Sequence, residues 1–111
     1  MGVSFNKVIV VGIGLIGGSI LKTIKELKMP FETYGVDLNE GVTKLAHNLG
    51  IIKNRDNKLE KIKDDCLIIF CVPSLAFEEA FKLVKDVFNK EKVIFTDTFS
   101  SKSDLLEFLE K

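Results

Sequence analysis

The sequence has little of what marks several common classes of protein. Its 111 residues include one arginine, one histidine, two cysteines and no tryptophan. Sixteen basic residues balance 16 acidic ones, so the net charge is zero. A chain with no excess of positive charge lacks the electrostatic footprint of a nucleic-acid-binding protein or of a protein held at an anionic membrane. We therefore expect no nucleic-acid partner.

Long apolar runs are also absent. No run approaches the ~20 residues that a membrane-spanning helix needs, and the start of the chain, MGVSFNK, lacks the pattern of a secretory signal. Cys66 and Cys71 bound an apolar run, and only His47 could join them, so a zinc site fails for want of ligands. We predict a cytoplasmic protein with two reduced cysteines, no metal site and no membrane anchor.

What the sequence does contain is an alternation of short apolar runs with longer amphipathic ones. The short runs are rich in β-branched residues, which is typical of buried parallel strands. The predicted strands are Lys7–Gly12, Glu32–Asp37, Leu67–Val72 and Val93–Asp97. Strands that alternate with helices predict an α/β fold, a doubly wound parallel sheet with helices on both faces. Because no linker or repeat interrupts the pattern, we predict one domain, residues 1–111.

The first two amphipathic runs predict helices with clear ends. One covers Leu15–Lys28 and cannot continue through Pro30. Asn39 can cap the next, and Gly50 can end it. Their expected buried faces are Ile16, Ile20, Ile24 and Leu27 in the first helix, and Val42, Leu45, Ala46 and Leu49 in the second.

Three more helices are predicted further along the chain. A short polar helix with Leu59 and Ile62 precedes the third strand, and a long helix follows Pro73. The apolar stripe of the long helix is Phe77, Ala80, Phe81, Val84, Val87 and Phe88. A last helix, which Ser101 or Ser103 opens, reaches the end of the chain without a capping residue. We therefore expect that the chain is truncated before a further domain.

The stretch VGIGLIGGS, Val11–Ser19, joins the first strand to the first helix and contains G-x-G-x-x-G. In this context Gly12 permits a tight turn, and Gly14 lets the backbone approach a pyrophosphate. Gly17 allows the helix to pack closely on the strand. The N-terminus of the helix then faces the anion with free N–H groups and the positive end of its dipole. The stretch predicts a dinucleotide-binding loop.

An acidic residue stands where such a loop requires one. Asp37 ends the second strand, twenty residues after Gly17, where its carboxylate can accept hydrogen bonds from the adenosine ribose. Its charge would repel a 2′-phosphate, and no arginine or lysine follows at Leu38 or Asn39 to bind one. The sequence therefore favours NAD over NADP as the cofactor.

The glycine loop and four further stretches resemble the prephenate and arogenate dehydrogenases. The turn after the fourth strand is similar to that family's T-D-x-G-S-x-K, with Phe99 in place of the glycine. The resemblance runs from about Lys7 to the last helix. Its pieces, in order, are GIGLIGGS (Gly12–Ser19), YGVDLNE (Tyr34–Glu40), AHNLGII (Ala46–Ile52), IIFCVP (Ile68–Pro73) and TDTFSSK (Thr96–Lys102).

The resemblance implies an enzyme that uses NAD or NADP to oxidise a cyclohexadienol hydroxyl with loss of the ring carboxylate. The product is 4-hydroxyphenylpyruvate or tyrosine. Asp37 would hold the ribose, and Ser100 would lie near the substrate hydroxyl. Val72 and Pro73 would line the path to the nicotinamide. The residues implied at the pyrophosphate are Gly12, Gly14, Leu15, Ile16 and Gly17.

The resemblance also implies what this chain lacks. The family's catalytic histidine, its substrate-binding arginine and the helical domain that makes the homodimer follow the turn after the fourth strand. His47 is predicted on the polar side of its helix and Arg55 in a polar loop, both solvated, although Arg55 could fall near the adenine. Because hydride transfer needs a base and a substrate anchor as well as a cofactor, we expect the isolated chain to bind NAD without catalysis.

Two other interpretations remain open from the sequence. The chain could be a free-standing NAD-binding or sensing module that covers its last helix by self-association. It could also be the cofactor domain of another dehydrogenase, such as the 3-hydroxyisobutyrate or pyrroline-5-carboxylate reductase types. Members of those families usually carry methionine before the third glycine, where this chain has Ile16.

Overall fold

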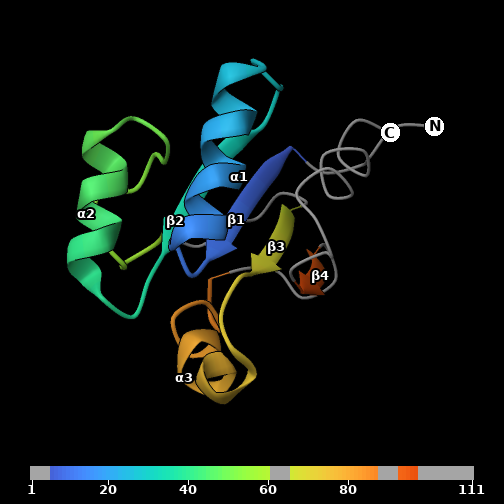
Figure 1. Cartoon of the computed structure of the whole chain (residues 1–111). Helices are drawn as coiled ribbons and strands as arrows, with labels where there is room; N and C mark the ends of the chain where they lie inside the picture. Colours follow the sequence, from blue (N-terminus) through green and yellow to red (C-terminus); the bar gives the residue numbers. More distant parts are fainter. Residues whose placement is uncertain (1–5, 61–65, 88–92, 98–111) are drawn as a thin grey trace.

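The structure of the chain is a computed structural model that describes residues 6–60, 66–87 and 93–97. Within these ranges four parallel strands form one sheet in the order β2-β1-β3-β4 (Figure 1). The strands are β1 (Lys7–Val11), β2 (Glu32–Val36), β3 (Cys66–Phe70) and β4 (Val93–Asp97). The other elements are α1 (Leu15–Glu26), α2 (Glu40–Asn48), the 3-10 helix η1 (Ser74–Ala76) and α3 (Phe77–Phe81). The four predicted strands and the doubly wound class are confirmed.

Strands β1 and β3 lie inside the sheet and are buried on both faces. Alternate side chains point to opposite faces of a strand, so the apolar runs divide between two cores. One core joins the sheet to α1 and α2, through Val8, Val10, Ile20, Leu21, Ile24, Ala46, Leu67 and Ile69. The other joins it to α3 and the residues after it, through Ile9, Val11, Cys66, Ile68, Phe70, Ala80, Val84 and Val87. Helices therefore cover both faces, as predicted.

The predicted ends of α2 are confirmed. The Oδ1 atom of Asn39 accepts a hydrogen bond of 3.0 Å from the N–H of Gly41. At the other end Gly50 adopts φ +76°, and its N–H donates to the carbonyl of His47 at 2.9 Å. This is the left-handed helix ending that glycine favours.

The predicted buried faces of the first two helices are partly wrong. Helix α1 ends at Glu26, before Pro30 is reached, because Lys28 adopts φ +53°. On each helix the apolar residues cover a wider surface than the part that packs against the sheet. Leu21 of α1 and Thr43 of α2, which were not in the predicted faces, are also buried. Four residues predicted to be buried are about half exposed: Ile16, Leu27, Leu45 and Leu49.

The predicted short helix with Leu59 and Ile62 is wrong over the part that the structure describes. Residues 51–60 contain no helix. Ile51 and Ile52 are buried, and the N–H of Lys53 donates to the carbonyl of Thr33 in β2 at 2.8 Å. The segment therefore runs along the outer edge of β2. Ile62 and the predicted last helix lie outside the described residues.

The predicted long helix after Pro73 is much shorter. Helix α3 spans five residues, and the chain continues from Lys82 to Val87 in turns. The turn hydrogen bonds join residues three apart, as from the N–H of Val84 to the carbonyl of Phe81 at 3.0 Å. Ala80, Val84 and Val87 are nevertheless buried as predicted. The apolar spacing thus fixes which side chains face the sheet, and tighter turns satisfy it as well as a helix does. Phe88 lies outside the described residues.

Candidate functional site

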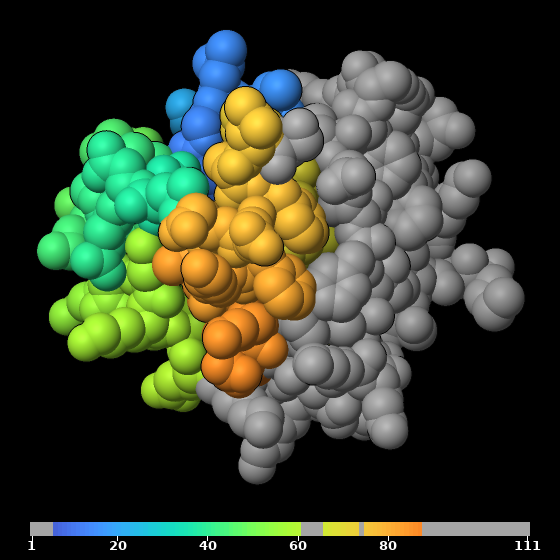
Figure 2. Space-filling view, turned by 90° about the horizontal axis from the view of Figure 1, so that it is seen from below, coloured from blue at the N-terminus to red at the C-terminus, as the bar shows by residue number. Residues whose placement is uncertain are grey.

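The site lies where the order of the strands reverses. The chain passes from β1 outward to the edge strand β2, then crosses back to place β3 on the other side of β1. The segments that leave β1 and β3 therefore lie next to each other, and Figure 2 shows the blue start of α1 adjoining the yellow segment after β3. Open α/β sheets bind ligands at this position, beyond the carboxyl ends of the strands.

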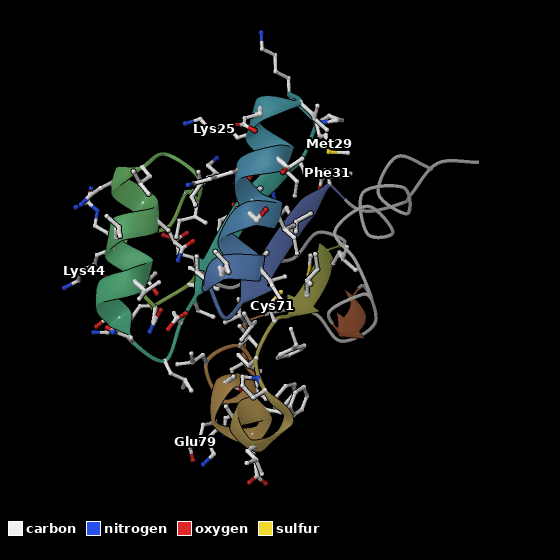
Figure 3. All side chains as sticks on the ribbon, viewed as in Figure 1. Lys25, Met29, Phe31, Lys44, Cys71 and Glu79 are labelled. Carbon is white, nitrogen blue, oxygen red and sulfur yellow. The ribbon has the colours of Figure 1, made fainter. Side chains whose placement is uncertain are left out.

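Two glycines of the loop are required by close packing. Gly12 adopts φ +96°, and a Cβ there would lie 2.6 Å from Cγ1 of Val72 and 2.8 Å from the carbonyl oxygen of Cys71. A Cβ on Gly17 would overlap the carbonyl oxygen of Gly12. Figure 3 shows Cys71 next to the start of α1. The loop therefore packs closely against both the segment after β3 and its own helix, α1.

Gly14 stands in open space instead. A Cβ on Gly14 would meet no atom within 4 Å, and its φ of −89° is accessible to any residue. Nothing in the packing of the described residues requires a glycine here. A glycine at this position leaves room for a group that approaches the backbone from outside, as a pyrophosphate does in this motif. The space therefore fits a phosphate.

The N-terminus of α1 opens into the same space. Gly14 is the N-cap residue and provides no side-chain hydrogen bond, and the first turn contains no acidic side chain. Leu15, the first helical residue, is 93% exposed. The first N–H groups of a helix have no partner within it, and they carry the positive end of the helix dipole. This end of α1 can hold an anion.

Asp37 is bonded directly to the glycine loop. Its Oδ2 atom accepts a hydrogen bond of 2.8 Å from the N–H of Ile13, and Oδ1 accepts one of 2.9 Å from the N–H of Asn39. The side chain is half-buried just beyond the end of β2. A carboxylate has about four lone-pair sites, so both oxygens can still accept hydrogen bonds from a ligand. Two ribose hydroxyls suit this arrangement.

Of the other predicted site residues, the structure describes Val72 and Pro73 but not Ser100. Val72 and Pro73 follow β3 and lie at the carboxyl edge of the sheet with the loop. Five large apolar side chains are also exposed in the segments that follow β1, β2 and β3: Leu15, Ile16, Leu38, Leu75 and Phe77. Ser100 lies outside the described residues, as does most of the TDTFSSK stretch.

His47 is not fully solvated, contrary to the prediction. It is half-buried, and its Nδ1 atom is buried without a hydrogen-bond partner among the described residues. It lines a pocket of about 490 Å³, and Lys44, on the outer side of α2 in Figure 3, lines it too. Arg55 in this pocket is exposed, as predicted. The remaining lining residues are Asn48 and Asp56. The pocket shares no residue with the glycine loop.

Two asparagines that the sequence reading missed lie beside the site. Asn57 is hydrogen-bonded to the backbone of Asp37, and Asn54 to the backbone of Gly35. The only sequence signal was the polar run NRDN, residues 54–57, which is typical of a loop. Among the described residues, no group of three or more His, Cys, Asp or Glu side chains could hold a metal ion. No helix in the described ranges is long and apolar enough to cross a membrane.

Comparison with known proteins agrees with this geometry. Residues 20–111 match the family model described as prephenate dehydrogenase, nucleotide-binding domain. The chain belongs to this family. The matched range begins after Gly17, so the glycine loop is assigned by its geometry and context. The resemblance to prephenate and arogenate dehydrogenases is confirmed, and the 3-hydroxyisobutyrate-type alternative is not favoured.

Two curated relatives are prephenate dehydrogenases. That of Lactococcus lactis subsp. cremoris (strain MG1363) is 33% identical over 102 residues, which cover 92% of this chain and 28% of that protein. That of Bacillus subtilis (strain 168) is 24% identical over 110 residues, which cover 96% of this chain and 29% of that protein. The chain therefore spans less than a third of the length of these prephenate dehydrogenases.

A solved structure shares the fold. It is the crystal structure of prephenate dehydrogenase from A. aeolicus in complex with hydroxyphenyl propionate and NAD+, which superimposes with a TM-score of 0.62 at 22% identity. The match covers 98% of this chain and 40% of that chain. This likeness shows that the chain has a Rossmann-type fold.

Proposed function

We propose that this chain, residues 1–111, is a dinucleotide-binding domain that takes NAD in preference to NADP. The observation that carries the proposal is the hydrogen bond of 2.8 Å from the N–H of Ile13 to Asp37, beside the open space at Gly14. It supports an arrangement in which Asp37 would accept hydrogen bonds from ribose hydroxyls beside a helix end that would hold the pyrophosphate. The relative solved with NAD+ supports the same cofactor. The negative charge of Asp37 disfavours the extra phosphate of NADP.

Each predicted residue has a role in this proposal. The backbone from Gly12 to Gly17, including Leu15 and Ile16, would wrap the pyrophosphate at the start of α1, and Asp37 would hold the adenosine ribose. Val72 and Pro73 would line the way to the nicotinamide, and Ser100 would lie near the substrate hydroxyl. The bound cofactor would supply the hydride-accepting carbon. The chain's own residues bind it and orient it.

The reaction of the whole enzyme is proposed from its relatives. The domain would serve the oxidative decarboxylation of prephenate to 4-hydroxyphenylpyruvate in tyrosine biosynthesis, or of arogenate to tyrosine, in a cytoplasmic homodimer without a nucleic-acid partner. We expect the 111 residues alone to bind NAD without turnover. The one histidine of the sequence lines a pocket separate from the glycine loop, so it is not placed to act as the base.

A calorimetric titration of the 111-residue chain tests the proposal. We expect saturable binding of NADH, clearly weaker binding of NADPH, and a loss of NADH affinity in Asp37→Ala. A folded chain that binds neither cofactor would refute dinucleotide binding. Equal affinity for both would refute the preference for NAD. Turnover of prephenate or arogenate with NAD by the chain alone would show that it contains a base this assignment has missed.

A further inference from the structure

The outer edge of β2 is closed by asparagine side chains. Within the described residues β2 pairs with β1 on one side only, which leaves the backbone groups of its other side to find partners elsewhere. The N–H of Gly35 donates to Oδ1 of Asn54 at 2.9 Å, and Nδ2 of Asn54 donates to the carbonyl of Gly35 at 2.6 Å. One side-chain amide thus replaces one residue of a neighbouring strand.

Asn57 repeats this arrangement two residues further along, at Asp37. The N–H of Asp37 donates to Oδ1 of Asn57 at 3.2 Å, and Nδ2 of Asn57 donates to the carbonyl of Asp37 at 2.7 Å. An amide carries an acceptor on one side and donors on the other, so only this orientation of the side chain satisfies both backbone groups. The backbone of the acidic residue is held on its outer side by a single residue.

Asn57 is itself fixed to α2. Its Oδ1 atom also accepts a hydrogen bond of 2.7 Å from the hydroxyl of Thr43, which is fully buried. Its N–H donates to Oε2 of Glu40 at 3.1 Å. A buried polar side chain that kept no partner would be costly. The hydroxyl of Thr43 therefore holds the amide of Asn57, and the amide holds Asp37.

We propose that Asn57 is a positioning residue for Asp37. By fixing the backbone of Asp37 on the side away from the glycine loop, it aims the carboxylate at the N–H of Ile13 and at the space where a ribose would lie. Asn54 makes the same pair of hydrogen bonds with Gly35, and its amide bonds to the backbone of Gly35 and Asp56 rather than to that of Asp37. The proposal rests on the proposed function, because the ribose is the group toward which Asp37 is aimed.

Asn57→Ala and Asn54→Ala are matched variants of the 111-residue chain. Each removes one amide that makes three hydrogen bonds at the edge of β2. Asn57→Ala also leaves the buried hydroxyl of Thr43 without this partner, so we expect its global stability to fall further, and the two variants are compared after correction for stability. The loss of one or two hydrogen bonds that position a ligand group predicts an affinity for NADH about 3- to 10-fold lower in Asn57→Ala. For Asn54→Ala we expect a change of less than about 2-fold, since its amide bonds only to the backbone of Gly35 and Asp56. In an Asp37→Ala background, Asn57→Ala should cause no further loss.

Hydrogen exchange of the ligand-free chain gives a second readout that does not depend on any cofactor. The amides of Ile13 and Asn39 donate to the carboxylate of Asp37. They should exchange faster in Asn57→Ala than in Asn54→Ala, once both are compared at equal global stability. If the wild-type chain binds no NADH, the proposed function fails and this readout still decides the role of Asn57.

Thr43 provides variants for the case that Asn57→Ala does not fold. Thr43→Val keeps the shape of the buried side chain and removes its hydroxyl, whereas Thr43→Ser keeps the hydroxyl. We expect faster exchange at Ile13 and weaker NADH binding in Thr43→Val, and near-normal values in Thr43→Ser. Equal effects of the Asn57 and Asn54 variants on both readouts would overturn the proposal. So would a Thr43→Val variant that matches the wild type in both.

Discussion

Ile13 and Asp37 are joined across the carboxyl edge of the sheet, from the loop that leaves β1 to the residue that follows β2. The N–H of one donates to the carboxylate of the other at 2.8 Å. The bond links the loop proposed to bind the pyrophosphate to the side chain proposed to accept from the ribose, so it couples the positions of the two parts of the proposed cofactor site. Its strength depends on the charge of Asp37, since hydrogen bonds to ionised acceptors are the stronger ones.

Asp37→Asn should change which cofactor is preferred. The substitution keeps the shape of the side chain but removes the charge, and it leaves one oxygen to accept from the N–H groups of Ile13 and Asn39. We expect NADH to bind about 10-fold more weakly, and NADPH to lose less because the repulsion of its 2′-phosphate disappears. Titration with both cofactors measures this ratio. An equal loss for both would show that the charge of Asp37 plays no part in selectivity.

Gly14→Ala separates binding from folding. A Cβ at this position meets no atom of the described chain within 4 Å, and the φ of −89° lies outside the left-handed region that favours glycine. We therefore expect the free energy of unfolding to change by no more than about 1 kcal/mol. The methyl group would occupy the space proposed for the pyrophosphate, so the affinity for NADH should fall by about 10-fold or more. Unchanged affinity would mean that the cofactor does not approach Gly14.

Gly17→Ala, in contrast, should lower the stability of the folded chain. Its Cβ would overlap the carbonyl oxygen of Gly12 and lie 2.9 Å from Cγ1 of Val10, so α1 would have to move away from β1. Overpacking of this kind costs about 1–3 kcal/mol. Gly18→Ala is the control, because a Cβ there is unobstructed and alanine favours a helix over glycine by about 0.5–1 kcal/mol. Urea denaturation should show Gly17→Ala destabilised and Gly18→Ala slightly stabilised. Two variants of equal stability would contradict the close packing of α1 on the loop.

The parts of the site that could be predicted from the sequence are those set by local chemistry. The glycine loop was identifiable because a β-branched run ends in Gly12 and an amphipathic run begins directly after Gly14. Asp37 was identifiable because the end of a second run falls at a fixed distance from the loop. The four strands followed from the same short-range patterns.

The contributions of Asn54 and Asn57 could not be predicted in this way. Asn54 bonds to the backbone of Gly35, 19 residues away, and Asn57 to the backbone of Asp37, 20 residues away. Only the folded edge of β2 brings these groups together. Asparagine in a polar run favours a loop by its local hydrogen bonding, and nothing in the run says which strand it closes. The hydroxyl of the buried Thr43 likewise finds its partner, Asn57, 14 residues away in the sequence.

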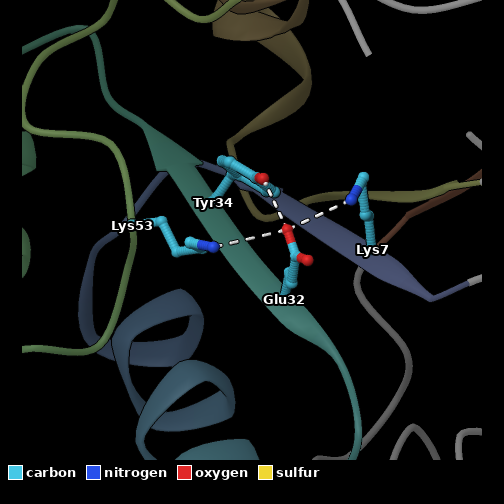
Figure 4. Close-up of polar contacts among 4 residues, drawn as sticks. All are labelled: Lys7, Glu32, Tyr34 and Lys53. Carbon is cyan, nitrogen blue, oxygen red and sulfur yellow. Dashed lines mark hydrogen bonds and ion pairs between the residues drawn. The ribbon is translucent and has the colours of Figure 1, made fainter. Parts of the chain in front are cut away.

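Glu32 is the first residue of β2, at the end of the strands away from the glycine loop, and should make stability depend on pH. Figure 4 shows three groups around its Oε1 atom. The hydroxyl of Tyr34 and Nζ of Lys7 donate hydrogen bonds of 2.8 Å and 3.1 Å, and Nζ of Lys53 forms an ion pair at 3.5 Å. The hydrogen bond from Tyr34, followed by that from Lys7 and the nearby positive charges, holds the pKa of Glu32 below its ordinary value. The folded state therefore favours the ionised carboxylate.

The direction of the effect follows from this lowered pKa. The stabilisation is fully present above the unfolded pKa of about 4.3 and is lost as the pH falls through the lower folded pKa. Because the Glu32 side chain is 45% exposed, screening by solvent limits the gain to about 0.5 kcal/mol. Urea denaturation between about pH 6 and pH 3 should show a shallower loss of stability in Glu32→Gln than in the wild type. Tyr34→Phe, which removes only the hydroxyl donor, should fall between the two. A Glu32→Gln curve parallel to that of the wild type throughout this range would mean that the two hydrogen bonds and the ion pair do not favour the ionised form.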